Sequence, residues 1–155
     1  MPGTVIPFSL RGTGSGVLNT VEVDGSPHKI TIEGHPAFGG TNSSLSPLDL
    51  VLASLLACIQ VTGKIVSTGM KGAELGQWDI ALEAGLDNSV LVFGETGPSN
   101  FQSVSLSVSV ESNLSEADFD HFTSEIERRC PITTLFRGSG VEYKMTWTPL
   151  PLAAN

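Results

Sequence analysis

The chain of 155 residues has only two cysteines, Cys58 and Cys130, and this scarcity limits the sites that they can form. Two thiols cannot build a disulfide-rich secreted scaffold or a zinc site made of cysteines alone. The histidines, His28, His35 and His121, do not have the spacing of metal ligands. We therefore expect neither a metal nor another cofactor, and we interpret the cysteines as free or redox-active thiols.

Positive charge is also scarce. Eight Lys and Arg residues stand against 16 Asp and Glu residues, which gives a net charge of −8 at pH 7. Too few cations are present to offset phosphate repulsion, so we expect neither nucleic acid nor an anionic membrane as a partner. Arg128, Arg129 and Arg137 nevertheless lie close to Cys130 in the sequence. This local concentration of cations marks the surroundings of Cys130 as unusual for this chain.

Long hydrophobic runs are absent too. The longest apolar stretch, residues 50–59, is interrupted by Ser54 and followed by Gln60, which makes it too short to cross a bilayer. The first residues lack the basic segment and the continuous apolar core of a signal peptide. We therefore expect a cytoplasmic protein that forms a single domain over residues 1–155, with enough hydrophobic residues for a packed core.

Hydrophobic periodicity and turn residues predict strands that alternate with helices. Residues 102–111 alternate serine with valine or leucine, a pattern typical of a strand with one face in water. Ser115 and Asp118 form a capping-box-like helix start, and Pro131 ends that helix near Cys130. The order of the elements predicts an α+β fold. The predicted strands cover residues 4–10, 17–23, 28–33, 78–86, 89–93, 102–111 and 141–148, and the predicted helices cover residues 47–67, 115–129 and 132–136.

Cys58 lies in the middle of the most apolar predicted helix, residues 47–67. Ser46 suits the N-cap of this helix, and Asp49 lies in its first turn, where negative charge is favourable. The helix is apolar on nearly every side until Gln60, so we expect most of its faces to be buried. Burial alone raises the pKa of a thiol. Two interpretations of Cys58 therefore stay open: a small core residue, or a thiol activated by a cation from elsewhere in the fold.

Cys130 directly precedes Pro131, and its surroundings differ from those of Cys58. If Pro131 begins a new helix, Cys130 occupies the cap position, where free N–H groups and the helix dipole favour an anionic sulfur. Arg128 and Arg129 add positive charge nearby. Alternatively, these two arginines stabilise the C-terminal end of the preceding helix. Both interpretations stay open from the residues alone.

Two segments, taken in order and with their spacing, match the signatures of a known family. The first contains Gly39-Gly40, then Ser46-Pro47-Leu48-Asp49-Leu50, then Ala53 and Ala57-Cys58. The second is Cys130-Pro131 after an acidic amphipathic helix. Together they resemble the OsmC/Ohr family of thiol peroxidases, and the resemblance spans residues 17–147, nearly the whole chain.

The resemblance implies an α+β fold with antiparallel sheets around a long buried central helix, in which two chains intertwine as a homodimer. It also implies that Cys58 attacks an organic hydroperoxide and becomes a sulfenic acid, and that Cys130 condenses with it to a disulfide. A dithiol of the lipoyl type would reduce this disulfide. Val51, Leu55 and Thr62 would then line a lipophilic substrate pocket, and the implied role is a response to peroxide stress.

The sequence departs from the family pattern after Pro47. Members with characterised catalysis carry a glutamate there that pairs with an arginine from the N-terminal strands, whereas this chain has Leu48. Asp49 is one residue further on, a rotation of ~100° around the helix. We take Arg11 as the first candidate for the arginine that activates Cys58, and Arg137 as a weaker one.

Two alternatives to a peroxidase follow from this departure. The chain could be a non-catalytic member that binds a small apolar ligand in the dimer pocket, or a redox sensor whose disulfide changes the binding of a partner. A lowered pKa of Cys58 favours catalysis, whereas an ordinary or raised pKa favours ligand binding. A sensor differs from a peroxidase because it is oxidised once and does not turn over.

Overall fold

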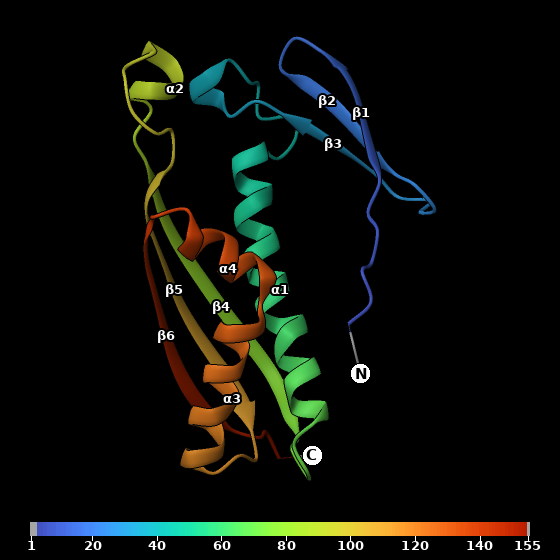
Figure 1. The fold of residues 1–155 in the computed structure, drawn as a ribbon, viewed down its shortest axis with the longest axis vertical. Helices are drawn as coiled ribbons and strands as arrows, with labels where there is room; N and C mark the ends of the chain where they lie inside the picture. Colours follow the sequence, from blue (N-terminus) through green and yellow to red (C-terminus); the bar gives the residue numbers. More distant parts are fainter. Residues whose placement is uncertain (1–2, 155) are drawn as a thin grey trace. The chain divides into compact units, whose positions relative to one another are not determined.

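The computed structural model describes residues 3–154 and divides the chain into two compact units, Met1–Val51 and Leu52–Asn155. Figure 1 labels the helices and strands of both units. The first unit contains β1 (Leu10–Ser15), β2 (Leu18–Val23), β3 (Lys29–Glu33) and the short 3-10 helix η1 (Pro36–Phe38). Helix α1 (Pro47–Thr68) begins at the end of this unit. The second unit contains β4 (Leu75–Leu86), α2 (Ser89–Phe93), β5 (Phe101–Ser112), α3 (Glu116–Arg129), α4 (Pro131–Gly138) and β6 (Glu142–Pro151).

The sheet of the first unit is antiparallel, in the order β1-β2-β3. The prediction of an edge strand over residues 4–10 was wrong, because the edge strand is β1 and includes the glycine-rich segment. These glycines build the turn between β1 and β2: Gly16 has a φ of 61°, and a Cβ on Gly14 would collide with the carbonyl oxygen of Leu18. The segment is therefore a tight hairpin.

The sheet of the second unit has the order β4-β5-β6, with β5 in the centre (Figure 1). β4 and β5 are antiparallel, whereas β5 and β6 are parallel. The expectation of purely antiparallel sheets was therefore wrong for this pair. A parallel pair needs a long connection that returns to the starting edge, and α3 and α4 supply it. The predicted α+β class is confirmed.

The core of the second unit lies against one face of β5. Its valines and leucine, Val104, Leu106, Val108 and Val110, are at most 2% exposed, and the serines between them face the other side. Buried residues of three elements belong to this core: Leu55, Ile59 and Val66 from α1, Phe119, Phe122 and Ile126 from α3, and Phe136 from α4. The predicted alternation of residues 102–111 is thus confirmed.

Helix α1 is buried along one side only, which corrects the expectation that most of its faces are covered. Leu55 and Ile59 are fully buried, but Val61 is 59% exposed and Ile65 is 55% exposed. Within residues 3–154, α1 is also the one helix with the length and composition of a membrane span, so the expectation that its apolar segment is too short to cross a bilayer was wrong on length. The core helices of soluble proteins meet the same criterion, and the buried side of α1 packs in such a core.

Residues 89–93 form the short helix α2, so the predicted strand there was wrong. The Asp87 side chain accepts a hydrogen bond from the Ser89 N–H at 2.9 Å, and Gly94 ends the helix in a left-handed conformation. The caps at both ends determine that residues 89–93 are helical. Five residues are too few for their periodicity to distinguish a strand from a helical turn.

Candidate active site

The two cysteines occupy different positions relative to their helices. Cys58 lies in the middle of α1 and is partly buried. Cys130 is fully buried between α3 and α4, where its extended backbone ends the first helix and caps the second. Pro131 follows as the first residue of α4, so the predicted helix break at Cys130 is confirmed. The Thr133 N–H donates to Cys130 Sγ at 3.5 Å.

The fold brings the two sulfur atoms into hydrogen-bond contact, and both cysteines are free thiols. Burial and this hydrogen bond to Cys130 raise the pKa of Cys58 above its ordinary value. A backbone hydrogen bond from Ile132 and the side chain of Thr62 act in the opposite direction, but they do not outweigh these two effects. Of the two sulfurs, Cys58 is therefore the one with the stronger tendency to keep its proton.

The pKa of Cys130 is shifted in the opposite direction, below its ordinary value. Burial works to raise its pKa, but hydrogen bonds from the side chain and backbone of Thr133, and from Cys58, outweigh burial and lower the pKa. The N-terminal end of α4 is the source of these backbone donors, as expected for a sulfur at a helix cap. The contact between the sulfurs is thus polarised: Cys58 donates the hydrogen bond, and Cys130 accepts it and has the lower pKa of the two.

Polar side chains of α3, α4 and β6 form a network that reaches Cys130 through Thr133. The hydroxyls of Thr133 and Tyr143 are 3.3 Å apart, and the Arg137 guanidinium lies 5.1 Å from the centre of the Tyr143 ring. Arg137 also pairs with Glu127 at 2.6 Å. The other oxygen of Glu127 accepts a hydrogen bond from Trp147 Nε1 at 2.8 Å. Arg137 therefore lies on the Cys130 side of the site, next to Tyr143.

The model of the OsmC-like protein family matches residues 40–145, which includes both cysteines and most of the second unit. The chain belongs to the OsmC-like family. No curated protein matches it significantly. Solved structures similar to this OsmC-like chain include an OsmC-like protein from Mycoplasma pneumoniae, with a TM-score of 0.75 and 18% identity over 95% of this chain and 99% of that one.

Two further similar structures carry functional names. The organic hydroperoxide resistance protein OsmC, also called a predicted redox protein, from Legionella pneumophila has a TM-score of 0.69 and 18% identity over 94% of this chain and 99% of that one. The organic hydroperoxide resistance protein OhrB of Bacillus subtilis has a TM-score of 0.62 and 16% identity over 92% and 98%. At these identities the likeness establishes the OsmC-like fold.

The other predicted site residues divide between the two units. Leu55, Thr62 and both cysteines belong to the second unit, where Thr62 reaches Cys58 and Leu55 is fully buried in the core. Arg11, Asp49 and Val51 belong to the first unit. Arg11 lies in β1, opposite Glu22 of β2. Val51 is 41% exposed.

Asp49 is engaged at the start of α1. Its Oδ2 atom accepts hydrogen bonds from the Ser46 hydroxyl at 2.6 Å and the Ser46 N–H at 3.0 Å, while its own N–H donates to Ser46 Oγ at 3.1 Å. These two bonds from Ser46 hold the pKa of the Asp49 carboxyl below its usual range. The carboxylate thus completes a capping box at this helix start, a structural role that the sequence signals as Ser-x-x-Asp.

Sequence reasoning missed Thr133 and Tyr143. A signal for Thr133 exists, because it stands three residues after Cys130, the spacing at which a cap side chain meets a backbone N–H. Tyr143, the only tyrosine of the chain, lies in β6, and nothing local connects it to Cys130. Only the packing of α4 against β6 brings these two residues together.

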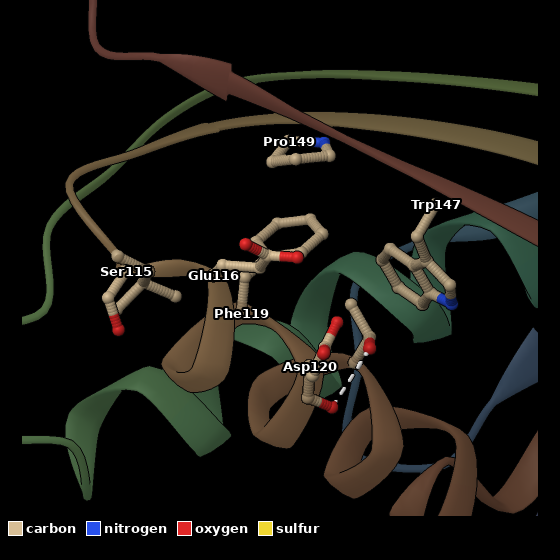
Figure 2. A pocket seen from close by; sticks show the side chains of 8 residues that line it. Ser115, Glu116, Phe119, Asp120, Trp147 and Pro149 are labelled. Atoms are coloured by element: carbon tan, nitrogen blue, oxygen red, sulfur yellow. Dashed lines mark hydrogen bonds between the residues drawn. The ribbon is translucent and has the colours of Figure 1, made fainter.

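A hollow of about 450 Å³ lies elsewhere in the second unit, at the start of α3 and the end of β6 (Figure 2). Phe119, Trp147 and Pro149 form its apolar surfaces, and Glu116 and Asp120 supply its carboxylates. It contains neither cysteine. Among residues 3–154, no group of three or more His, Cys, Asp or Glu side chains could hold a metal ion.

Proposed function

We propose that this chain is a cysteine-dependent peroxidase that reduces organic hydroperoxides through Cys58 and Cys130. The observation that carries the proposal is the hydrogen bond between the two free thiols, since a sulfenic acid on one sulfur would form within reach of the other. The proposal draws further support from fold neighbours named organic hydroperoxide resistance proteins.

The first step uses the proton that the two sulfurs share. The directions of the two pKa shifts favour a reactive pair with one proton, in which Cys58 is the thiol and Cys130 the thiolate. Transfer of the Cys58 proton to Cys130 creates the Cys58 thiolate, which attacks the terminal oxygen of the hydroperoxide and breaks its O–O bond. The departing alkoxide takes the proton from Cys130 and leaves as the alcohol. Cys58 is now a sulfenic acid, and Cys130 is a thiolate again.

The second step closes the disulfide. The Cys130 thiolate attacks the sulfur of the Cys58 sulfenic acid, an S–S bond forms, and hydroxide leaves and is protonated to water. A dithiol then reduces the disulfide by thiol–disulfide exchange and is itself oxidised. We propose a reductant of the lipoyl type, and Cys130 serves in this scheme both as proton shuttle and as resolving cysteine.

We also propose that the chain works as a homodimer in the cytoplasm. Val61 and Ile65 support the first point, because both are apolar and more than half exposed on α1. Light scattering after size-exclusion chromatography measures the mass in solution. We expect a dimer for the natural chain and a monomer for Ile65→Asp, with Gln60→Asp as the control at an exposed polar position of the same helix. A monomeric natural chain would contradict the proposal.

The raised pKa of Cys58 favours one alternative, a non-catalytic protein that binds a small apolar ligand. One experiment separates the two functions: the intact mass of the reduced protein after one equivalent of cumene hydroperoxide. A peroxidase loses about two mass units as the two thiols become a disulfide, and the Cys58→Ser variant does not. An unchanged mass within minutes would exclude the peroxidase and favour the ligand-binding protein.

A redox sensor would lose the same mass but would not turn over. Consumption of hydroperoxide in the presence of excess dihydrolipoamide therefore decides between sensor and peroxidase. We expect many equivalents of hydroperoxide to disappear for each chain. Consumption that stops at one equivalent while the reductant is still present would identify a sensor.

A further inference from the structure

Both the backbone N–H and the side-chain hydroxyl of Thr133 act on Cys130. It is fully buried in the first turn of α4. Its N–H donates to Cys130 Sγ at 3.5 Å, and its hydroxyl also hydrogen-bonds the sulfur. The same hydroxyl lies 3.3 Å from the Tyr143 hydroxyl. Thr133 therefore links the buried sulfur to a side chain of β6.

The number of available protons fixes the direction of this chain of hydrogen bonds. When Cys130 is a thiolate it only accepts, so in that state the single hydroxyl proton of Thr133 points to Cys130 Sγ. Thr133 Oγ1 then has no proton left for Tyr143, and the Tyr143 O–H must donate to it. Burial raises the pKa of Tyr143, so this hydroxyl stays protonated and available as a donor. In a low-dielectric interior, consecutive hydrogen bonds of this kind polarise and strengthen one another.

We propose that Thr133 and Tyr143 form a hydrogen-bond relay that keeps the negative charge of the thiol pair on Cys130. Both are positioning residues, because neither reacts with peroxide in the scheme above. The inference deepens the proposed peroxidase and rests on it for its functional meaning. The relay explains how the pKa of a fully buried thiol can be lowered although burial alone opposes the charge.

The charged and titratable groups around the relay come from all the elements that pack there. Cys58 of α1 donates to the same sulfur. Arg137 of α4 lies over the Tyr143 ring, and its charge, after the hydrogen bond with Thr133, offsets part of the rise that burial causes in the pKa of Tyr143. Glu127 of α3 acts in the opposite direction and pairs with Arg137. Thr133 and Tyr143 are the neutral donors between this ion pair and the sulfur.

The test measures the ionisation of Cys130 by the ultraviolet absorbance of the thiolate in a Cys58→Ala background, which has no other thiol. This readout does not require a reagent to reach the buried sulfur, and it does not require peroxidase activity. Thr133→Val keeps the shape of the side chain but removes the hydroxyl. We expect it to raise the Cys130 pKa by about one unit, a roughly tenfold lower ratio of thiolate to thiol.

Two further variants make the test specific. Thr133→Ser restores the hydroxyl, and we expect it to restore the pKa. Thr134→Val is the matched control, because the Thr134 hydroxyl bonds the backbone oxygen of Cys130 at 3.2 Å, and we expect the pKa of Cys130 to stay unchanged. An unchanged pKa in Thr133→Val, or an equal shift in Thr134→Val, would overturn the relay.

Tyr143→Phe keeps the inference testable if Thr133→Val does not fold. It removes only the terminal donor of the chain, and we expect a smaller rise of the Cys130 pKa, about half a unit. No rise would show that Tyr143 does not contribute. Because the measurement uses a chain without Cys58, it is independent of the peroxidase proposal. The relay can be confirmed in a protein that does not consume hydroperoxide, and it can be overturned in a protein that does.

Discussion

Cys58 and Cys130 show how position within a helix decides the behaviour of a thiol. Cys58 lies in mid-helix, where the backbone N–H groups of its own helix are used by the helix itself. Cys130 caps α4, where an N–H of the first turn is free to donate to its sulfur. Cys130 is the more buried of the two, yet it has the lowered pKa. Local donors therefore outweigh burial at this site.

Removing each sulfur in turn tests this division of roles and should have the largest effect. We expect Cys58→Ser to abolish hydroperoxide consumption, because the remaining sulfur, Cys130, is fully buried and the peroxide does not reach it. Cys130→Ser should complete a single attack and then stop with Cys58 as a sulfenic acid or a higher oxide. Mass spectrometry of each variant after one equivalent of peroxide distinguishes these states. Normal cycling of Cys130→Ser with a dithiol would show that Cys130 does not resolve the sulfenic acid.

The pH dependence of peroxide reduction should sharpen the comparison. The reactive form of the pair has one proton, so it exists above the lowered pKa of Cys130 and below the raised pKa of Cys58. We expect a plateau between these two values and an acid-side fall of about tenfold per pH unit. Stopped-flow rates measure the profile. A single rise centred at or above the ordinary thiol value of 9.0 would contradict the polarised pair.

A third prediction concerns the close approach of α1 to β4 and α3 at Gly63. Gly63 is buried, and a Cβ there would lie 2.5 Å from Trp78 Cη2 and 3.2 Å from Ile126 Cδ1. Gly63→Ala should therefore reduce the free energy of unfolding by about 1–3 kcal/mol and slow disulfide formation, since it pushes α1 away from its neighbours. Gly138→Ala is the control, because a Cβ at Gly138 meets no atom within 4 Å.

Urea unfolding measures the stability of both glycine variants, and the rate of mass loss after peroxide measures disulfide formation. We expect Gly138→Ala to match the natural chain in both. Equal stability of Gly63→Ala and the natural chain would show that the contact with Trp78 relaxes at little cost. An unchanged disulfide rate in a destabilised Gly63→Ala would show that the two sulfurs stay in contact independently of this packing.

Much of the fold could be predicted from local patterns. The serine alternation of β5, the Ser46-Pro47 start of α1 and the break at Cys130-Pro131 are all confirmed. The secondary-structure predictions that were wrong lie where the sequence pattern fits more than one local structure. Residues 89–93 form a helix because of their caps, and the glycines of residues 12–16 serve a hairpin turn that composition alone does not distinguish from a loop.

The sequence by itself determined where each cysteine stands in its helix, because caps, prolines and apolar periodicity act between residues near one another in the chain. It also determined the family through the two cysteine segments and their spacing. Only the tertiary structure decided which of the two thiols has the lower pKa. That difference depends on Cys58 from α1 and Thr133 from α4 meeting at one buried sulfur, with the Tyr143 hydroxyl of β6 next to that of Thr133. The physical reason is that hydrogen bonds act over about 3 Å, so donors from distant segments influence a thiol only after packing has placed them.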